Sequence, residues 1–183
     1  MRRVVVTGLG TINPLGNNVS ASWNSLVHSK SGISKITKFE VDNYPCKIAG
    51  SIDDKTIDQE IVSQRDQRKI DRFITLGLIA ADEAVKDSGF VSNSENSFRA
   101  GVMVGSGIGG LDTIYKNSSI LDNHGIRKIS PFFIPSSLIN LLSGHISIKY
   151  NLKGPNSSPV TACATGTHLS LIHISEPTRQ VLI

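Results

Sequence analysis

Residues 100–110 read AGVMVGSGIGG, an apolar run that leads into a cluster of glycines. The run at 100–104 predicts a buried strand, because short apolar segments bounded by turn residues are typical of strands covered on both faces. The glycines predict a tight turn, and a helical pattern follows through Leu121. A strand, a tight turn and a helix in this order indicate an α/β fold.

The same alternation recurs on both sides of this segment. Further strands are predicted at 2–9 and 158–162. Apolar residues at helical spacing predict a helix over 70–86, and Pro135 suits the start of another helix that runs to Tyr150. Strands that alternate with helices in this way indicate a mixed, mostly parallel sheet with helices on its faces.

The composition is that of a globular chain with a modest charge. Of its 183 residues, 39% are hydrophobic, and the formal net charge of +4 comes from scattered lysines and arginines. The chain has no basic arm of the kind that binds nucleic acid, and no apolar run approaches the roughly 20 residues of a membrane span. Its two distant cysteines fit a reducing compartment. We therefore expect a soluble, cytoplasmic protein with no nucleic-acid partner and no membrane insertion.

Two candidate signals for cofactors are weak. Gly105, Gly107 and Gly110 match the G-x-G-x-x-G pattern of dinucleotide-binding turns, but no acidic residue follows where the ribose would need one. A tight turn in which close backbone approach excludes side chains explains these glycines better. The five histidines lack metal-ligand spacing. We expect neither a metal nor a cofactor.

Basic residues cluster at two places in the sequence. The first group is spaced to line one stripe of a helix and comprises Arg65, Arg68, Lys69 and Arg72. The second is a pair in a loop, Arg127 and Lys128. A solvated helix face is the simpler interpretation, and the residues alone favour it over a docking patch for an acidic partner.

VTACATGTH, residues 160–168, places Cys163 between a β-branched run and small residues. A strand that runs into this turn would put the thiol at a helix N-terminus, where backbone N–H groups and the helix dipole favour a thiolate. A buried structural cysteine is the alternative. The local pattern does not decide between a nucleophile and a packed thiol.

Four stretches together resemble one family, the β-ketoacyl-acyl-carrier-protein synthases. They occur in the family's order and read RRVVVTGLGTINPLGNNV (2–19), GVMVGSGIGGL (101–111), PFFIPSSLINLLSGHISIKYNLKGPN (131–156) and VTACATGTH (160–168). The resemblance is strongest to the type II synthases, which elongate fatty-acyl chains. It implies a thiolase-like layered fold, of which residues 1–168 form the amino-terminal half, in a protein that acts as a homodimer.

The resemblance also implies a reaction and the residues that carry it. Cys163 matches the nucleophile that takes an acyl group from acyl carrier protein or coenzyme A, with its backbone N–H in the oxyanion hole. Malonyl-loaded carrier protein then loses CO₂, and its carbanion attacks the thioester. Ile108 matches an acyl-pocket residue, and Phe133 matches a position at the dimer-facing pocket wall. The basic residues that match the carrier-docking surface are Arg65, Arg68, Lys69, Arg127 and Lys128.

Two features depart from the family pattern. The family needs two histidines and a supporting lysine from its carboxy-terminal half, and His168 is not one of them, so we expect this chain alone to be inactive. LSLIHISEPTR, residues 169–179, resembles the translation of a transposase adapter used in sequencing libraries. Residues 169–183 are therefore expected to be a non-native tail. The alternative functions are a polyketide-type ketosynthase and a non-catalytic partner subunit of the same fold; the presence of Cys163 argues against the second.

Overall fold

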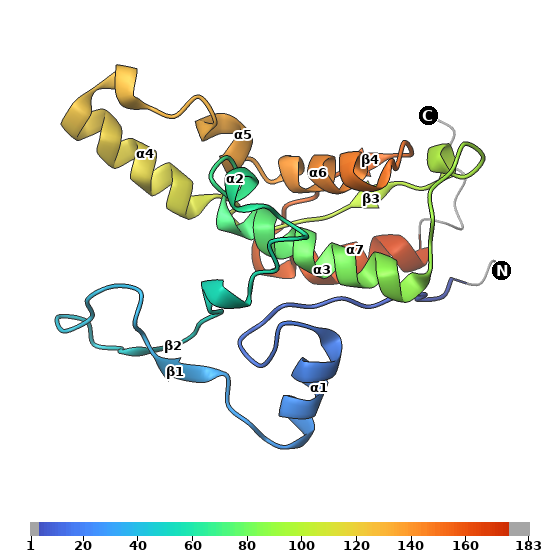
Figure 1. Ribbon diagram of the computed structural model, residues 1–183, viewed down its shortest axis with the longest axis horizontal. Coiled ribbons are helices and arrows are strands. Elements are labelled where there is room, and N and C mark those ends of the chain that lie inside the picture. Colours follow the sequence, from blue (N-terminus) through green and yellow to red (C-terminus); the bar gives the residue numbers. More distant parts are fainter. Residues whose placement is uncertain (1–3, 176–183) are drawn as a thin grey trace. The chain divides into compact units, whose positions relative to one another are not determined.

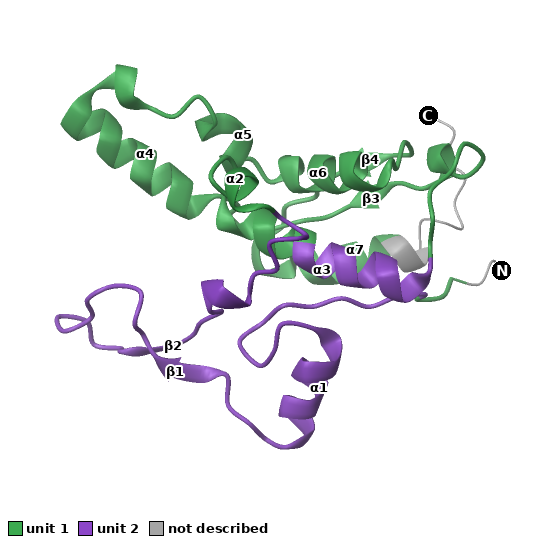
Figure 2. Ribbon diagram, in the orientation of Figure 1, with its two compact units in different colours: residues 1–6, 63–78, 90–183 green, residues 7–62, 79–89 purple. Residues whose placement is uncertain are grey.

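The computed structural model describes residues 4–175, which fall into two compact units (Figures 1 and 2). Unit 2 comprises Thr7–Val62 and Ile79–Gly89. Unit 1 comprises the described parts of Met1–Val6, Ser63–Leu78 and Phe90–Ile183. The boundary between the units falls inside the longest described helix, α3 (Arg72–Ser88).

Unit 2 is built from short elements and the second part of α3. Its other elements are α1 (Val19–Val27), β1 (Ile33–Lys35), β2 (Ile48–Gly50) and the 3₁₀ turn η1 (Asp54–Thr56). β1 and β2 pair antiparallel, with Ile33 opposite Gly50. Helix α1 begins after Asn18 because the side-chain oxygen of Asn18 accepts a 2.7 Å hydrogen bond from the N–H of Ala21.

Carboxylates on α3 hold the amino-terminal segment of unit 2. Glu83 accepts hydrogen bonds from the backbone N–H groups of Thr11 (2.9 Å) and Val19 (2.8 Å). Asp87 accepts another from the N–H of Leu9 (2.9 Å). The strand predicted at 2–9 is wrong for its described part, residues 4–9, which form no strand. An apolar segment becomes a strand only where a neighbouring backbone offers a hydrogen-bond ladder.

Unit 1 contains a parallel strand pair and most of the helices. Its further helices are α2 (Gln64–Gln67), α4 (Leu111–His124), α5 (Phe133–Ser137), α6 (Asn140–Tyr150) and α7 (Thr165–Ser175). Its strands are β3 (Val102–Met103) and β4 (Asn156–Ser157), and its 3₁₀ turns are η2 (Ser97–Arg99), η3 (Ile126–Lys128) and η4 (Ala162–Ala164). β3 and β4 pair in parallel, and α6 packs against both strands (Figure 1). The helices between them supply the crossover that a parallel pair requires.

Aliphatic side chains form the core of unit 1. Gly77 on α3 allows close packing against α6, because a Cβ at this position would lie 2.5 Å from Cδ2 of Leu142. Burying each such aliphatic side chain contributes about 1.5–3 kcal/mol, so this cluster holds α3, α6 and the strand pair together. The buried apolar residues of unit 1 are Ile74, Leu78, Val102, Leu142, Ile146 and Leu152.

The helix predictions agree with the structure better than the strand predictions do. The helix over 70–86 is confirmed as α3, and the helix after Gly110 is confirmed as α4. The strand predicted over 100–104 is present only as β3. The strand predicted over 158–162 is wrong, because the pairing ends with β4. Pro159 follows almost at once, and it has no N–H with which to continue a ladder.

The single helix predicted from Pro135 to Tyr150 is two helices. Pro135 lies in the first turn of α5, where a missing N–H is tolerated. The extended backbone of Leu138 (φ −77°, ψ 135°) separates α5 from α6. The break leaves the carbonyl of Ser137 free to accept a 3.1 Å hydrogen bond from the N–H of Gly110. That contact joins distant segments, so helical periodicity could not indicate it.

Candidate active site

Cys163 lies in a turn at the start of a helix. Its side chain is exposed, it occupies the middle of η4, and α7 begins two residues later at Thr165. Ala162 precedes it with φ 49°, a left-handed backbone that is uncommon for a residue with a side chain. We call residues 161–165 the cysteine turn. Within the described chain, Cys163 is therefore not a buried structural cysteine.

Hydrogen bonds inside the cysteine turn converge on Thr165. The Thr165 side chain is buried, with 4% of the residue's surface exposed. Its hydroxyl oxygen accepts a 2.9 Å hydrogen bond from the N–H of Thr161 and donates one of 2.8 Å to the carbonyl of Ala162. A ring nitrogen of His168, Nδ1, lies 2.8 Å from Oγ1 of Thr161. These contacts fix the backbone on both sides of Cys163.

The glycine-rich segment at 105–110, here called the glycine turn, lies directly against the cysteine turn. A Cβ on Gly105 would overlap the Thr165 methyl group and approach the carbonyl oxygen of Pro159 to 2.5 Å. A Cβ on Gly107 would lie 3.5 Å from the carbonyl oxygen of Ala162. Close backbone approach, predicted for these glycines in preference to nucleotide binding, is confirmed for Gly105.

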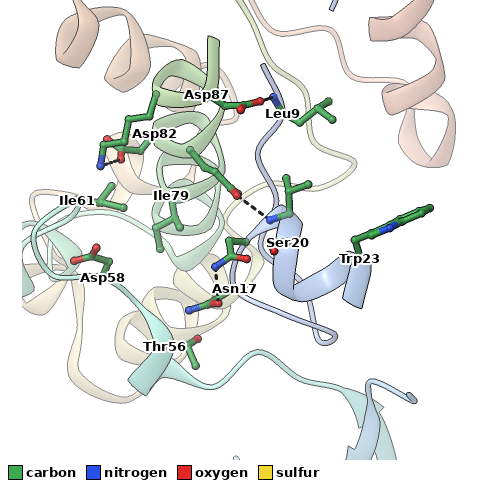
Figure 3. A pocket seen from close by; sticks show the side chains of 14 residues that line it. Leu9, Asn17, Ser20, Trp23, Thr56, Asp58, Ile61, Ile79, Asp82 and Asp87 are labelled. Carbon is green, nitrogen blue, oxygen red and sulfur yellow. Dashed lines mark hydrogen bonds and ion pairs between the residues drawn. The ribbon is translucent and has the colours of Figure 1, made fainter. Parts of the chain in front are cut away.

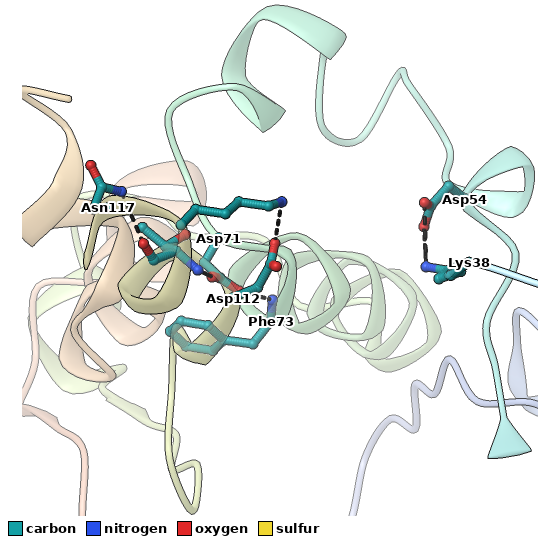
Figure 4. Close-up of polar contacts among 8 residues, drawn as sticks. Lys38, Asp54, Asp71, Phe73, Asp112 and Asn117 are labelled. Atoms are coloured by element: carbon teal, nitrogen blue, oxygen red, sulfur yellow. Dashed lines mark hydrogen bonds and ion pairs between the residues drawn. The ribbon is translucent and has the colours of Figure 1, made fainter. Parts of the chain in front are cut away.

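A buried carboxylate anchors the end of the glycine turn. Asp71 is 6% exposed and accepts a hydrogen bond from the N–H of Phe73 (3.2 Å), as Figure 4 shows. It accepts another from the N–H of Thr113 (3.0 Å). The first contact caps α3, and the second caps α4, which starts where the glycine turn ends. Sequence reasoning missed this residue. An aspartate just before a helical pattern signals a cap for that helix, but no local signal indicates that the same carboxylate also caps α4.

The two residues expected in the acyl pocket lie on neighbouring elements. Ile108 is part of the glycine turn and is 67% exposed. Phe133 is half-buried at the first position of α5, and the last residue of that helix, Ser137, is hydrogen-bonded to Gly110. The structure thus brings the segment that carries Ile108 together with both the cysteine turn and the end of α5.

The basic residues do not form the predicted single stripe. Helix α2 ends at Gln67 and α3 begins at Arg72, so Arg65 and Lys69 do not share one helix. The break occurs because Asp71 caps a new helix. Arg65 and Arg68 are exposed, while Lys69 is half-buried and its Nζ lies 3.4 Å from Oδ1 of Asp66.

The second basic group is remote from the first. Arg127 and Lys128 are exposed in η3, which follows the C-terminal end of α4. Asp71 is hydrogen-bonded to the opposite, N-terminal end of that helix. Helix α4 has 14 residues and is therefore about 21 Å long. Figure 1 shows η3 at the opposite end of α4 from the glycine turn. The two groups can act together only on a partner that spans this length.

Two ionisable groups near the basic residues have shifted pKa values. A hydrogen bond from the Ser63 hydroxyl, and then one from Lys69, lower the pKa of Asp66. Burial in α6 lowers the pKa of His145, and the negative charge of Asp66 partly opposes that shift. His145 is thus a half-buried helix histidine, as its sequence pattern suggested.

The described residues contain neither a metal-binding cluster nor a membrane-spanning helix. No group of three or more His, Cys, Asp or Glu side chains within them converges to hold a metal ion. None of the described helices has both the length and the apolarity that crossing a bilayer requires.

Unit 2 contains a separate cleft of about 710 Å³ between α1 and α3 (Figure 3). Trp23 and Ile79 contribute apolar surface, and carboxylates contribute negative charge. These carboxylates already have partners, because Glu83 and Asp87 accept backbone N–H groups and Asp82 lies 2.6 Å from Nζ of Lys86. The Asp82 contact raises the pKa of Lys86. These contacts of its carboxylates stabilise the fold of unit 2.

Comparisons with known proteins agree on one family. The model described as "Beta-ketoacyl synthase, N-terminal domain" matches residues 1–176. A 3-oxoacyl-[acyl-carrier-protein] synthase 2 from Coxiella burnetii is 49% identical over 168 residues, which cover 91% of this chain and 40% of the relative. The same-named protein of Vibrio harveyi is 46% identical over 167 residues, and that of Staphylococcus aureus is 40% identical over 167, with the same shares covered. This chain thus spans 40% of the length of these relatives.

Solved structures confirm the expected fold class. The ishigamide ketosynthase/chain length factor superimposes with a TM-score of 0.75 at 21% identity, covering 94% of this chain and 44% of the other. A type II polyketide ketosynthase, solved in complex with its acyl-carrier protein, superimposes with a TM-score of 0.67 at 25% identity, covering 92% and 44%. The described residues therefore form part of a thiolase-like α/β fold. The predicted boundary at residue 168 and the tail after it stay predictions.

Proposed function

This chain belongs to the β-ketoacyl synthase family, and we propose that the whole protein is a condensing enzyme of fatty-acid elongation with Cys163 as its nucleophile. The observation that carries the proposal is the position of Cys163, exposed in a tight turn that leads into α7. The names of the relatives, 3-oxoacyl-[acyl-carrier-protein] synthase 2, support the substrate class.

The first half-reaction transfers an acyl group to the cysteine. The Cys163 sulfur attacks the carbonyl carbon of an acyl thioester, a new C–S bond forms, and the bond to the carrier thiol breaks. The released carrier thiolate takes up the proton that the cysteine gave up. Negative charge develops on the carbonyl oxygen during the attack, and backbone N–H groups at the start of a helix stabilise such charge. The backbone N–H of Cys163 is the group we assign to this task.

The second half-reaction forms the carbon–carbon bond. Malonyl-carrier protein releases CO₂, and the electron pair of the broken bond becomes a carbanion that attacks the acyl-cysteine. A C–C bond forms, the cysteine leaves as thiolate, and the product is 3-oxoacyl-carrier protein. We assign the decarboxylation to two histidines and a lysine that the whole protein supplies. On this assignment the chain of 183 residues is inactive alone.

The test is mass spectrometry of the full-length protein after incubation with acyl-carrier protein. We expect an acyl adduct on the peptide that contains Cys163. Cys46 is the internal control, because it is also exposed but lies in unit 2. An adduct elsewhere, with Cys163 unmodified, contradicts the proposal.

We propose that Ile108 limits the length of the acyl chain. Its exposure on the glycine turn, which packs against the cysteine turn, supports this role. Ile108→Phe is expected to reduce the use of long acyl chains roughly 5- to 150-fold relative to short ones, since overpacking a cavity costs about 1–3 kcal/mol. Competition assays with a series of acyl thioesters measure this ratio. Equal loss for all lengths means that Ile108 only packs the fold.

We propose that Arg65, Arg68, Lys69, Arg127 and Lys128 form the carrier-docking surface. Four of the five are exposed and Lys69 is half-buried; that exposure supports this role, as does the solved neighbour that binds an acyl-carrier protein. The double variant Arg68→Glu/Lys69→Glu is expected to slow acylation by carrier-protein substrates about tenfold at low salt, because rim charges chiefly set the association rate. Coenzyme A thioesters should react at the wild-type rate.

The matched control for this variant reverses two exposed lysines of unit 2, Lys30 and Lys35, with the same change in net charge. It should leave both substrate classes unaffected. If the control slows the carrier substrate as much as the double variant does, net charge and not a docking site explains the effect.

A polyketide-type ketosynthase is the second candidate, favoured by the solved neighbour at 25% identity. The higher identities of 40–49% to the 3-oxoacyl-[acyl-carrier-protein] synthases favour fatty-acid elongation. The two differ in their products: a single condensation per acyl chain supports elongation, whereas repeated condensation without release of the chain supports polyketide synthesis. A homodimer is proposed for the whole protein on the family resemblance, and its mass in solution tests this.

A further inference from the structure

We infer that Thr165 is a positioning residue, whose hydroxyl holds the strained backbone before Cys163 in the geometry that acyl transfer needs. The inference rests on the proposed function of Cys163. Thr165 is buried, and its role is to act through the conformation of the cysteine turn.

The hydroxyl of Thr165, which follows Cys163, makes two hydrogen bonds with the backbone that precedes Cys163. It accepts from the N–H of Thr161 at 2.9 Å and donates to the carbonyl of Ala162 at 2.8 Å. One hydroxyl group thereby satisfies a donor and an acceptor of the two residues that precede Cys163. Its 4% exposure keeps water from replacing either contact.

The residue that this clamp holds has a backbone that needs support. Ala162 has φ 49°, a left-handed conformation that residues with a Cβ avoid. Strained residues persist where surrounding contacts over-determine them, and they cluster at functional sites. The carbonyl of Ala162 accepts from the Thr165 hydroxyl and from the Thr165 N–H. Without the hydroxyl, Ala162 can relax and turn Cys163 away.

The methyl group of Thr165 has a separate role in packing. It occupies the space that Gly105 leaves open, because a Cβ on Gly105 would overlap this methyl group. The two halves of one side chain therefore make different contacts, the hydroxyl with the cysteine turn and the methyl with the glycine turn. Replacements that keep only one of these two groups can separate their roles.

The experiment compares Thr165→Val, which keeps the methyl group, with Thr165→Ser, which keeps the hydroxyl, in the full-length protein. Single-turnover acylation of Cys163 by an acyl-coenzyme A is followed by mass spectrometry. We expect Thr165→Val to slow the acylation step about tenfold with little change in KM, and Thr165→Ser to react near the wild-type rate. If Thr165 served stability alone, both variants would have a lower melting temperature. Thr165→Val would then not show a slower acylation step at an unchanged KM.

A second change tests the backbone directly. Ala162→Gly introduces a residue that adopts positive φ without strain, so it should restore part of the rate in the Thr165→Val background. The double variant also decides the matter if Thr165→Val alone is too unstable to purify. An unchanged rate in Thr165→Val, an equal loss in Thr165→Ser, or no rescue by Ala162→Gly overturns the inference.

Failure of the inference is distinguishable from failure of the proposed function. If the wild-type protein acquires its acyl adduct on Cys163 and Thr165→Val reacts equally fast, the function stands and the positioning role is wrong. If the wild-type adduct forms at another residue, the proposed nucleophile itself is wrong and the inference falls with it.

Discussion

Replacement of Cys163 by alanine in the full-length protein is expected to lower kcat/KM for condensation by roughly a thousandfold or more, because a covalent intermediate cannot form without its nucleophile. Cys163 is exposed at the start of α7, where a thioester can reach it. The measurement is the rate of formation of 3-oxoacyl-carrier protein as a function of the acyl and malonyl substrate concentrations, which gives kcat/KM.

Cys46→Ala is the matched control for this variant. Cys46 is also free and exposed, and its only described hydrogen bond is with the carbonyl of Ile48 at 3.3 Å. The change should leave condensation unaffected. Condensation that persists in Cys163→Ala, or is lost equally in Cys46→Ala, rules out the assigned nucleophile. Decarboxylation of malonyl-carrier protein by Cys163→Ala would locate any remaining activity in the other catalytic groups.

The second large effect is expected on stability, at the contact between the glycine turn and the cysteine turn. Gly105→Ala should lower the free energy of unfolding of the full-length protein by about 1–3 kcal/mol. The added Cβ would lie 2.5 Å from the carbonyl oxygen of Pro159 and overlap the methyl group of Thr165. The backbone must therefore shift, and acyl transfer to Cys163 should slow as well. Urea denaturation measures the first effect and single-turnover acylation the second.

Gly144→Ala provides the same chemical change at an open position. Outside its own stretch of α6, no described residue places a heavy atom within 4 Å of a Cβ built on Gly144. Alanine is the better helix former, so this variant should gain about 0.5–1 kcal/mol of stability. If both variants shift stability equally and in the same direction, the glycine turn does not pack against the cysteine turn as described.

Local patterns were sufficient for α3, for α4 and for the family. The apolar spacing that defines α3 spans several turns, and spacing over that length leaves few alternatives to a helix. The motif around Cys163 combines a turn, small residues and the thiol that we propose as the nucleophile, and all three are encoded in consecutive residues. The family resemblance rested on such stretches, and its assignment of the fold class was correct.

Strands and basic residues were predicted less well, because their structure depends on partners elsewhere in the chain. Residues 4–9 have a strand's composition but form no strand, since composition cannot supply a neighbouring ladder. The spacing of Arg65 and Lys69 suited one helix, yet Asp71 caps a new helix after them. A cap can override periodicity because its side chain accepts hydrogen bonds from backbone N–H groups. In a continuous helix, those N–H groups would instead donate to carbonyls of the preceding turn.

Local signals in the sequence were thus enough to predict the long helices, the tight turns and the cysteine at the start of a helix. Which of these elements meet depends on contacts that only the folded chain makes. Asp71 links the starts of two helices, and the methyl group of Thr165 fills the space beside Gly105. Both contacts join residues far apart in the chain. The physical reason is that hydrogen bonding and close packing depend on distance in space, whereas periodicity and capping depend on neighbours in sequence.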